Sequence, residues 1–259
     1  MATHVQPQLV NIELVLATAN AGKVREVRKL TNDFPVMWRS LADLDSFIPP
    51  DETGATFVEN ALIKAVAAWN QSGLPSVADD SGLVVDALNG APGVHSARFA
   101  GLHGDDSANI KLLLEKLNNV DSTERTAHFV CAMVLVGSQA DPLIRPISTL
   151  DSGKTPADSV DHPNKLRENE PPKSQSWRCL TAHPLLPPDT FAIIAEGRVE
   201  GRILPQPCGS GGFGYDPIFF YPPLRKTFAE LSTDEKNQFS HRAAALTGLL
   251  DWLTPMPVT

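Results

Sequence analysis

Residues 75–82 have the sequence PSVADDSG, and they decide how the rest of the chain is arranged. A short apolar run ends here in two adjacent carboxylates, Asp79 and Asp80, followed at once by Ser81 and Gly82. Serine and glycine after an apolar run are typical of a tight turn, so the pattern predicts a strand that ends at a polar site. Ligands of open sheets bind beyond the carboxyl ends of strands, where paired acids can hold a cation or activate water. A solvated, Asp-rich turn would have the same composition.

A strand and a helix are predicted on the N-terminal side of this segment. Residues 11–18 are apolar and partly β-branched, as in a buried first strand. A polar loop with Thr18, Asn20 and Lys23 follows, and apolar residues then recur at helical spacing. The N–H groups at the start of that helix and the Lys23 ammonium form a candidate phosphate site. The GxxxxGK[ST] motif is absent, and an ordinary loop between a strand and a helix would have a similar sequence.

A second helix is predicted between this loop and residues 75–82. Thr56 and Glu59 have the spacing of a capping box, which opens a helix through about Trp69. Thr56, Asn60 and Lys64 lie four residues apart and share one face of that helix. This face would present its polar groups either to a cleft or to solvent.

On the C-terminal side, two strands flank a segment of different composition. Residues 126–136 predict a central strand, and residues 190–194 predict another. Residues 141–189 between them are rich in proline and polar residues and show little periodicity. Such a segment buries too little apolar surface to offset its ordering entropy, so we expect a flexible insertion in the loop of a hairpin.

The last third of the chain combines a glycine-rich segment with two predicted helices. Residues 208–216, CGSGGFGYD, contain two aromatic rings and glycines that permit close approach of a flat ligand. A capping box, Ser232 with Glu235, opens a short helix. Ser240 is expected to cap the final helix, which places the following His241 and Arg242 at its N-terminus.

The composition excludes several classes of protein. The chain has 259 residues, a net charge of -8 and a pI near 5.3, so we expect neither a nucleic-acid nor a membrane partner. It shows no signal-peptide pattern and no run of membrane-spanning length, which favours the cytoplasm. Cys131, Cys179 and Cys208 are odd in number and far apart, as expected for reduced thiols.

Several short motifs occur in a fixed order along the chain. They are Thr18-x-Asn20-x-x-Lys23, Glu52-Thr-Gly54, Phe57-x-Glu-Asn-Ala61, Ala78-Asp-Asp-Ser-Gly82, Gly93-x-x-Ser-Ala-Arg98, Phe213-Gly-Tyr-Asp-Pro217, Glu235-Lys236 and Ser240-His-Arg242. Together they resemble the inosine triphosphate pyrophosphatase-like family, and ADDSG and FGYDPIFF are similar to its bacterial-type dITP/XTP pyrophosphatase branch.

The resemblance implies an elongated α/β fold in which a long mixed sheet is flanked by helices and a cleft lies between two lobes. It covers nearly the whole chain, so residues 1–259 are expected to form a single nucleotide pyrophosphatase domain, with the insertion at 141–189. The family is usually homodimeric. The implied enzyme is a hydrolase that uses Mg²⁺ and converts noncanonical purine nucleoside triphosphates (ITP, dITP, XTP) to the monophosphate and pyrophosphate, cleansing the nucleotide pool.

The same resemblance assigns roles to individual residues. Glu52, Asp79 and Asp80 would hold the metal, and Asp80 would also be the catalytic proton acceptor for the attacking water. The triphosphate would bind to Thr18, Asn20 and Lys23. The remaining substrate-binding residues would be Ser81, Phe213, Gly214, Tyr215, Asp216, Lys236, His241 and Arg242, with Phe213 stacking on the base.

Selection of the base requires discrimination between a 6-keto and a 6-amino group. A site whose buried donors need the keto oxygen can discriminate by about 10⁴ or more, because the wrong base leaves those donors unpaired. Lys236, His241 and Arg242 are donors of the right kind.

Two alternatives stay open at this point. The first is a non-catalytic nucleotide-binding protein, which the retention of all the predicted acids and cations disfavours. The second is a pyrophosphatase for another modified nucleotide, such as a pyrimidine triphosphate. Analysis of the products from a panel of nucleotides distinguishes the three hypotheses.

Overall fold

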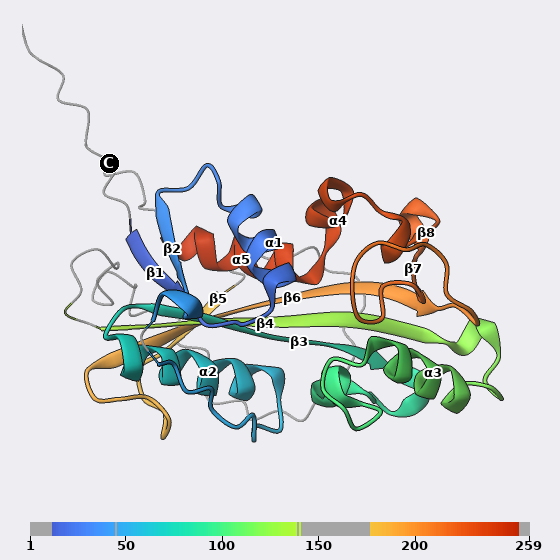
Figure 1. Ribbon diagram of the computed structural model, residues 1–259, viewed down its shortest axis with the longest axis horizontal. Coiled ribbons are helices and arrows are strands. Elements are labelled where there is room, and N and C mark those ends of the chain that lie inside the picture. The colour runs from blue at the N-terminus through green and yellow to red at the C-terminus, as the bar shows by residue number, and fades with distance from the viewer. Residues whose placement is uncertain (1–11, 45, 139, 141–176, 254–259) are drawn as a thin grey trace, which may run out of the picture.

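An eight-stranded mixed sheet runs the length of the molecule (Figure 1). The computed structural model describes residues 12–253 except 45, 139 and 141–176. The strand order is β2-β1-β3-β4-β6-β7-β8, and β5 pairs with β6 off this path. Strands β1, β2 and β3 are parallel to one another, and the remaining pairs are antiparallel. The predicted α/β fold with a mixed sheet is confirmed.

The strands differ widely in length. They are β1 (Ile12–Leu16), β2 (Val36–Ser40), β3 (Ser76–Val85), β4 (Thr126–Ser138), β5 (Trp177–Leu180), β6 (Thr190–Ile203), β7 (Phe219–Tyr221) and β8 (Lys226–Thr227). The helices are α1 (Ala21–Leu30), α2 (Phe57–Ser72), α3 (Asp106–Lys116), α4 (Thr233–Phe239) and α5 (His241–Leu253).

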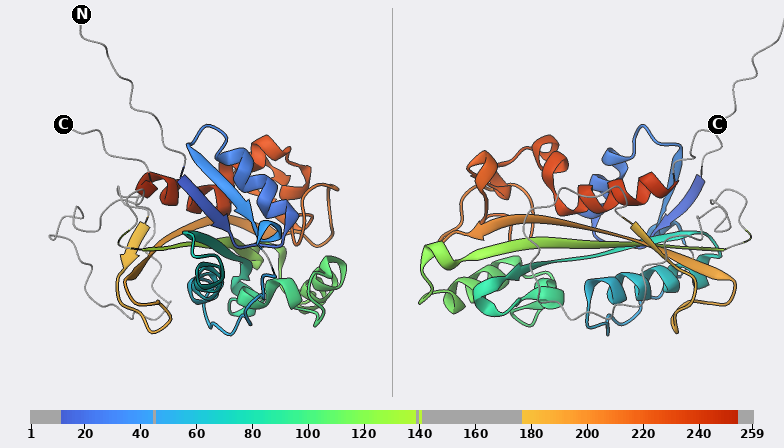
Figure 2. Two further views of the ribbon diagram at one scale, coloured as in Figure 1. Left: turned by 60° about the vertical axis from the view of Figure 1, so that its left-hand side comes forward. Right: turned by 180° about the vertical axis from the view of Figure 1, so that it is seen from behind.

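Helices cover both faces of the sheet. Helices α1, α4 and α5 lie on one face, and α2 and α3 lie on the other (Figure 1, Figure 2). One core packs α5 residues such as Leu246 and Trp252 against the sheet, and a second packs the alanine-rich stripe of α2 against the opposite face. Within the described residues, no helix is both long and apolar enough to cross a bilayer.

The predicted turn at residues 79–82 is wrong. Strand β3 continues through them to Val85, and every residue from Ser76 to Val85 pairs with β4. Local turn preference is outweighed here because the long apolar β4 supplies a complete ladder of backbone hydrogen bonds, and strand formation depends on such context. The two acids therefore lie inside a strand, where neighbouring side chains point to opposite faces of the sheet.

The expected hairpin around the insertion is present, but its boundary differs from the prediction. Strands β4 and β6 pair from Thr126 opposite Arg202 to Ser138 opposite Thr190, so the two predicted strands are the arms of this hairpin. Within the predicted insertion, however, residues 177–180 form β5, which pairs with Ala192–Ala195 of β6 and is therefore part of the sheet. Trp177–Leu180 itself contains no proline. The many prolines in the rest of the predicted insertion concealed this short strand in the sequence. Residues 141–176 lie outside the described part of the chain.

The predicted helix starts are confirmed. Thr56 and Glu59 form a reciprocal capping box at α2, and Ser232 and Glu235 form another at α4. The Ser240 hydroxyl accepts a hydrogen bond from the Ala243 N–H at 3.1 Å, which caps α5. These helix starts are predictable from local sequence because side chains two or three residues away accept hydrogen bonds from the first N–H groups of each helix.

Close contact between α5 and β6 depends on a glycine. A Cβ atom at Gly197 would lie 2.0 Å from the His241 carbonyl oxygen and 2.6 Å from the Ala245 nitrogen. Because both atoms belong to the helix backbone, we expect Gly197→Ala to lower the free energy of unfolding by more than about 3 kcal/mol, the upper range for overpacking. Urea unfolding measures the change. The control is Gly73→Ala, where a Cβ meets nothing within 4 Å and only the left-handed φ of 67° is unfavourable, a cost of about 1 kcal/mol. Equal losses in the two variants would contradict the packing argument.

Candidate functional site

A cavity of about 620 Å³ lies where β1 ends, beside an edge of β3 that pairs with no other strand among the described residues. Strand β1 pairs with β3 only at Ser76 and Val77, whereas the cavity is lined by β3 residues from Asp80 to Leu83. The carboxyl end of a strand does therefore mark the site, but the strand is β1 and not β3. All but one of the predicted site residues line this cavity, and the exception is Asp79. The predicted residues that line it are Thr18, Asn20, Lys23, Glu52, Asp80, Ser81, Phe213, Gly214, Tyr215, Asp216, Lys236, His241 and Arg242.

The loop between β1 and α1 is shaped by its own side chains. Asn20 is the N-cap of α1, and its Oδ1 accepts hydrogen bonds from the N–H groups of Gly22 and Lys23 at 2.8 and 3.2 Å. The Thr18 hydroxyl accepts one from the Asn20 N–H at 3.2 Å. The loop thus presents Lys23 in the first turn of a helix, where the helix dipole also favours an anion.

Asp79 lies on the face of the sheet covered by α1 and α5. Its carboxylate is 2.8 Å from Lys23 Nζ and 3.4 Å from Arg242 Nε, and it accepts a hydrogen bond from the Ser81 hydroxyl at 2.9 Å. Burial alone would raise the pKa of Asp79, but Lys23 and Arg242 outweigh it and hold the pKa well below its usual range. Asp79 is therefore an ionised buried counterion for two cations of the site.

Asp80 lies on the opposite face, against α2. Its Oδ1 is 3.0 Å from Lys64 Nζ, and its Oδ2 accepts a weaker hydrogen bond from the Asn60 amide at 3.3 Å. Burial raises the pKa of Asp80, and Lys64 offsets this effect only in part. A carboxylate with a raised pKa that lines a cavity is suited to accept a proton.

The predicted metal ligands are only partly brought together. Glu52 Oε1 and Asp80 Oδ1 lie 3.4 and 3.0 Å from the same ammonium group, that of Lys64, whereas Asp79 lies across the sheet. Among the described residues, no group of three or more His, Cys, Asp or Glu side chains has the arrangement of a metal site. Two carboxylates that already converge on one cation do fit Mg²⁺, which commonly binds one or two carboxylates together with substrate phosphates.

The glycine-rich segment forms the opposite wall of the cavity. The Asp216 carboxylate is 2.6 Å from Lys236 Nζ and accepts a hydrogen bond from the Phe213 N–H at 2.9 Å. Lys236 Nζ lies 4.7 Å from the centroid of the Phe213 ring, and the Arg242 guanidinium lies 5.9 Å from it. This wall therefore combines an aromatic ring with two buried cations, a combination suited to a flat, electron-rich ligand.

His241 and Arg242 enter the cavity from the start of α5. Burial, together with the charges of Arg242 and Lys236, holds the pKa of His241 well below its usual value, so the imidazole is neutral at pH 7. Its Nδ1 is buried and has no hydrogen-bond partner in the described part of the protein. A buried polar atom without a partner is costly, so a ligand that pairs with it would gain affinity.

Three residues that were not predicted belong to the site. Lys64 bridges Glu52 and Asp80, and Glu26 forms ion pairs with Arg242 and Lys236. The spacing of Lys23 and Glu26, three residues apart on one helix, was a usable signal for Glu26. The polar face of α2 included Lys64, but the sequence does not show whether that face meets a cleft or solvent. Asp106 also lines the cavity, and nothing in the sequence distinguishes it from the adjacent Asp105.

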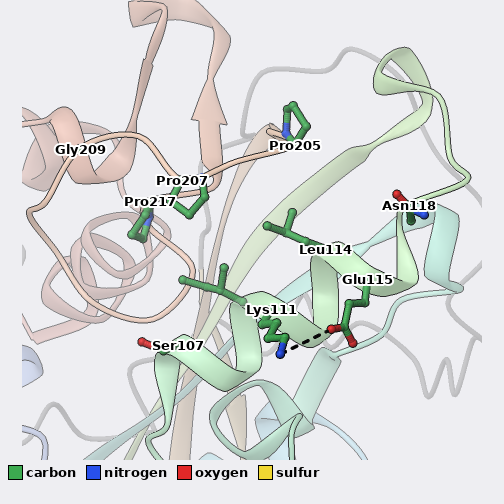
Figure 3. A pocket seen from close by; sticks show the side chains of 10 residues that line it. Ser107, Lys111, Leu114, Glu115, Asn118, Pro205, Pro207, Gly209 and Pro217 are labelled. Atoms are coloured by element: carbon green, nitrogen blue, oxygen red, sulfur yellow. Dashed lines mark ion pairs between the residues drawn. The ribbon is translucent and has the colours of Figure 1, made fainter.

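A larger hollow of about 850 Å³ lies elsewhere, between α3 and the proline-containing segment 205–217 (Figure 3). Its charged lining residues are Lys111 and Glu115, an exposed pair 4.0 Å apart on the surface of α3. No predicted site residue lines it. The larger hollow lacks convergent ionisable groups among its lining residues. The smaller cavity is therefore the better candidate for chemistry.

Proteins of known family are similar to this chain over most of its length. The sequence model described as "Ham1 family" matches residues 14–152 and 152–252. The "dITP/XTP pyrophosphatase" of Shigella flexneri is 40% identical over 243 residues, which are 93% of this chain and 98% of that protein. The protein of the same name from Idiomarina loihiensis is 42% identical over 246 residues, covering 93% and 96% of the two chains. A solved structure of "a HAM1 protein from Coxiella burnetii" is 36% identical, with a TM-score of 0.68 over 93% of this chain and 98% of that one.

Proposed function

The chain belongs to the Ham1 family, and from this premise we propose that it hydrolyses noncanonical purine nucleoside triphosphates to the monophosphate and pyrophosphate. The observation that carries the proposal is the composition of one cavity. It contains the Asp80 carboxylate, the helix start with Lys23, and the wall with Phe213 and Lys236. A proton acceptor, a phosphate site and an aromatic surface are the parts that hydrolysis of a nucleotide requires.

The proposed reaction begins with a water molecule next to Asp80. The water oxygen attacks the α-phosphorus, its proton passes to the Asp80 carboxylate, and the bond from that phosphorus to the oxygen bridging it to the β-phosphorus breaks. The ammonium groups of Lys23 and Lys64 lie in the same cavity and favour the negative charge that develops on the phosphate oxygens. Asp79 takes no proton in this scheme, because Lys23 and Arg242 keep it ionised.

Glu52 and Asp80 are the residues proposed to hold Mg²⁺, since their carboxylates face the same cation in the structure. When bound, the ion would neutralise phosphate charge and polarise the phosphoryl oxygens. Asp79 is not proposed as a ligand, because its carboxylate lies on the other face of the sheet and pairs with Lys23 and Arg242.

Recognition of the base is proposed for the wall formed by Phe213, Lys236, His241 and Arg242. The buried cations donate only, so they favour a keto oxygen and leave a 6-amino group without an acceptor. The unpaired Nδ1 of the neutral His241 supplies one more polar contact for a purine.

We further propose that the protein acts as a homodimer in the cytoplasm and that residues 1–259 form one domain. Membership of the family supports these points. Analytical ultracentrifugation of the full chain measures the assembly directly.

A panel of nucleotides tests the proposed function. With Mg²⁺, we expect ITP, dITP and XTP to give the monophosphate and pyrophosphate, and ATP to react at least about 10⁴-fold more slowly in kcat/KM. Products are separated by ion-exchange chromatography, and a parallel reaction with EDTA is expected to stop. Release of orthophosphate would contradict the assigned bond. Binding of ITP without turnover would favour a non-catalytic protein, and preference for a modified pyrimidine triphosphate would favour the other alternative.

A further inference from the structure

The turn that carries Phe213 is built from residues that have little intrinsic rigidity. Gly212 and Gly214 both adopt left-handed φ angles, 74° and 62°, and a Cβ at Gly212 would overlap the Asp216 carboxylate at 2.0 Å. Inside the turn, the Phe213 N–H donates to Asp216, and the Asp216 N–H donates to the Phe213 carbonyl at 3.3 Å. Glycine-rich backbone has many alternative conformations, so contacts from outside the turn must select this one.

Asp106 supplies such a contact from a distant part of the chain. Its Oδ2 accepts a hydrogen bond from the Gly214 N–H at 2.7 Å, across 108 positions of sequence. Asp106 is the first residue of α3, so its backbone is fixed by the helix. Tyr215 adds a second tie to the same side, because its hydroxyl donates to the Ser96 carbonyl at 2.9 Å. Of these two ties, the one from Asp106 is made to a charged acceptor, and such hydrogen bonds are the stronger kind. Lys236 also holds the turn, through its ion pair with Asp216 at 2.6 Å, but it does not contact Gly214.

We propose that Asp106 is a positioning residue for base recognition: it fixes the Gly214 N–H and thereby holds the adjacent Phe213 ring in place against the base. The inference rests on the proposed function of the cavity. It assigns to Asp106 a role in binding the base half of the substrate and none in the proton transfer at Asp80.

The adjacent acid provides a matched control. Asp105 is the N-cap of α3, and its carboxylate accepts a hydrogen bond from the Ala108 N–H at 3.0 Å. Within the part of the chain that the structure describes, it forms no hydrogen bond or ion pair with the turn. Asp105→Ala therefore weakens the start of α3, whereas Asp106→Ala removes the tie to Gly214. The conservative variant Asp106→Asn keeps an amide oxygen that can accept the same N–H.

The test measures binding of inosine monophosphate and of pyrophosphate separately by calorimetry. We expect Asp106→Ala to weaken inosine monophosphate binding by roughly tenfold or more, since a hydrogen bond to a charged group is lost, and to leave pyrophosphate binding unchanged. Asp106→Asn should retain most of the affinity, and Asp105→Ala should change neither ligand by more than about twofold. An equal loss in Asp106→Asn and Asp106→Ala would overturn the positioning role, because it would indicate direct contact of the charge with the nucleotide.

A second measurement is independent of activity. Hydrogen exchange of the amides of residues 212–216 in the unliganded protein should be faster in Asp106→Ala than in the wild type and in Asp105→Ala. Unchanged exchange would overturn the inference even if ITP is hydrolysed. Faster exchange in a protein that hydrolyses no purine triphosphate would overturn the proposed function and leave the structural tie to Gly214 established, so the two failures are distinguishable.

Discussion

Asp80→Asn is expected to lower kcat for ITP hydrolysis by at least about 100-fold, the low end for loss of a general base. The amide has nearly the shape of the carboxylate and still accepts a hydrogen bond from Lys64, but it cannot take the proton of the attacking water. The affinity for substrate should change much less than kcat, because the phosphate loop, the Phe213 wall and the Glu52 carboxylate are untouched and the amide oxygen at position 80 can still bind Mg²⁺. Single-turnover kinetics with excess enzyme separate the two effects.

Asp51→Asn is the control for this variant. Asp51 is exposed, precedes Glu52 and does not line the cavity, so its loss changes the net charge by the same amount without touching the site. Near-normal turnover in Asp80→Asn would remove Asp80 from the role of proton acceptor. An equal loss in Asp51→Asn would indicate that overall charge is the cause.

Much of the architecture was predictable because local signals determine it. The capping boxes at Thr56 and Ser232 fix the helix starts with contacts between near neighbours, and the apolar run in β4 fixes a central strand. The path of β3 was not predictable in this way. Residues 79–82 have turn composition, and only pairing with β4, about 50 residues later in the chain, keeps them extended.

Because residues 79–82 were predicted as a turn, the different roles of the two adjacent acids were also missed. In a turn, Asp79 and Asp80 could share one ion, but in a strand they point to opposite faces and contact different helices. Asp80 lines the cavity and Asp79 does not, and the partners of neither acid were predictable. Lys64 and Glu26 show the same limit, because the contacts of a side chain depend on how helices pack on the sheet.

The charges of the cavity constrain how a substrate enters. Lys23, Lys64, Lys236 and Arg242 each already pair with a carboxylate in the structure. A triphosphate must therefore share these four cations with acids that are part of the protein, and Arg25 is the one further Lys or Arg among the described residues that line the cavity. An added divalent cation resolves this conflict, which gives a physical reason for the proposed Mg²⁺.

Asp79→Asn is expected to destabilise the fold by about 3–5 kcal/mol, the usual cost of removing one partner from a buried ion pair. Asp79 is 4% exposed and lies against Lys23 and Arg242, so among the described residues the variant leaves Lys23 without a carboxylate partner and Arg242 with Glu26 as its remaining one. Activity should fall as well, since both cations belong to the site. Urea unfolding at pH 7 with EDTA measures the free energy.

Asp80→Asn provides the matched comparison, because Asp80 is one residue away and lies on the opposite face of the sheet. Burial raises the folded pKa of Asp80, so its ionisation contributes less to stability than that of Asp79, and Lys64 keeps Glu52 as a carboxylate partner. The loss of stability at pH 7 should therefore be much smaller in Asp80→Asn than in Asp79→Asn. The folded pKa of Asp79 is depressed, so its contribution is fully present above the unfolded value of about 3.9 and is lost as the pH falls through the folded value. The penalty of Asp79→Asn should accordingly stay constant from pH 7 to pH 5 and shrink only below about pH 4. Equal stability of the two variants at pH 7 would contradict the separation of the acids across the sheet, on which the assignment of Asp79 as counterion and Asp80 as base depends.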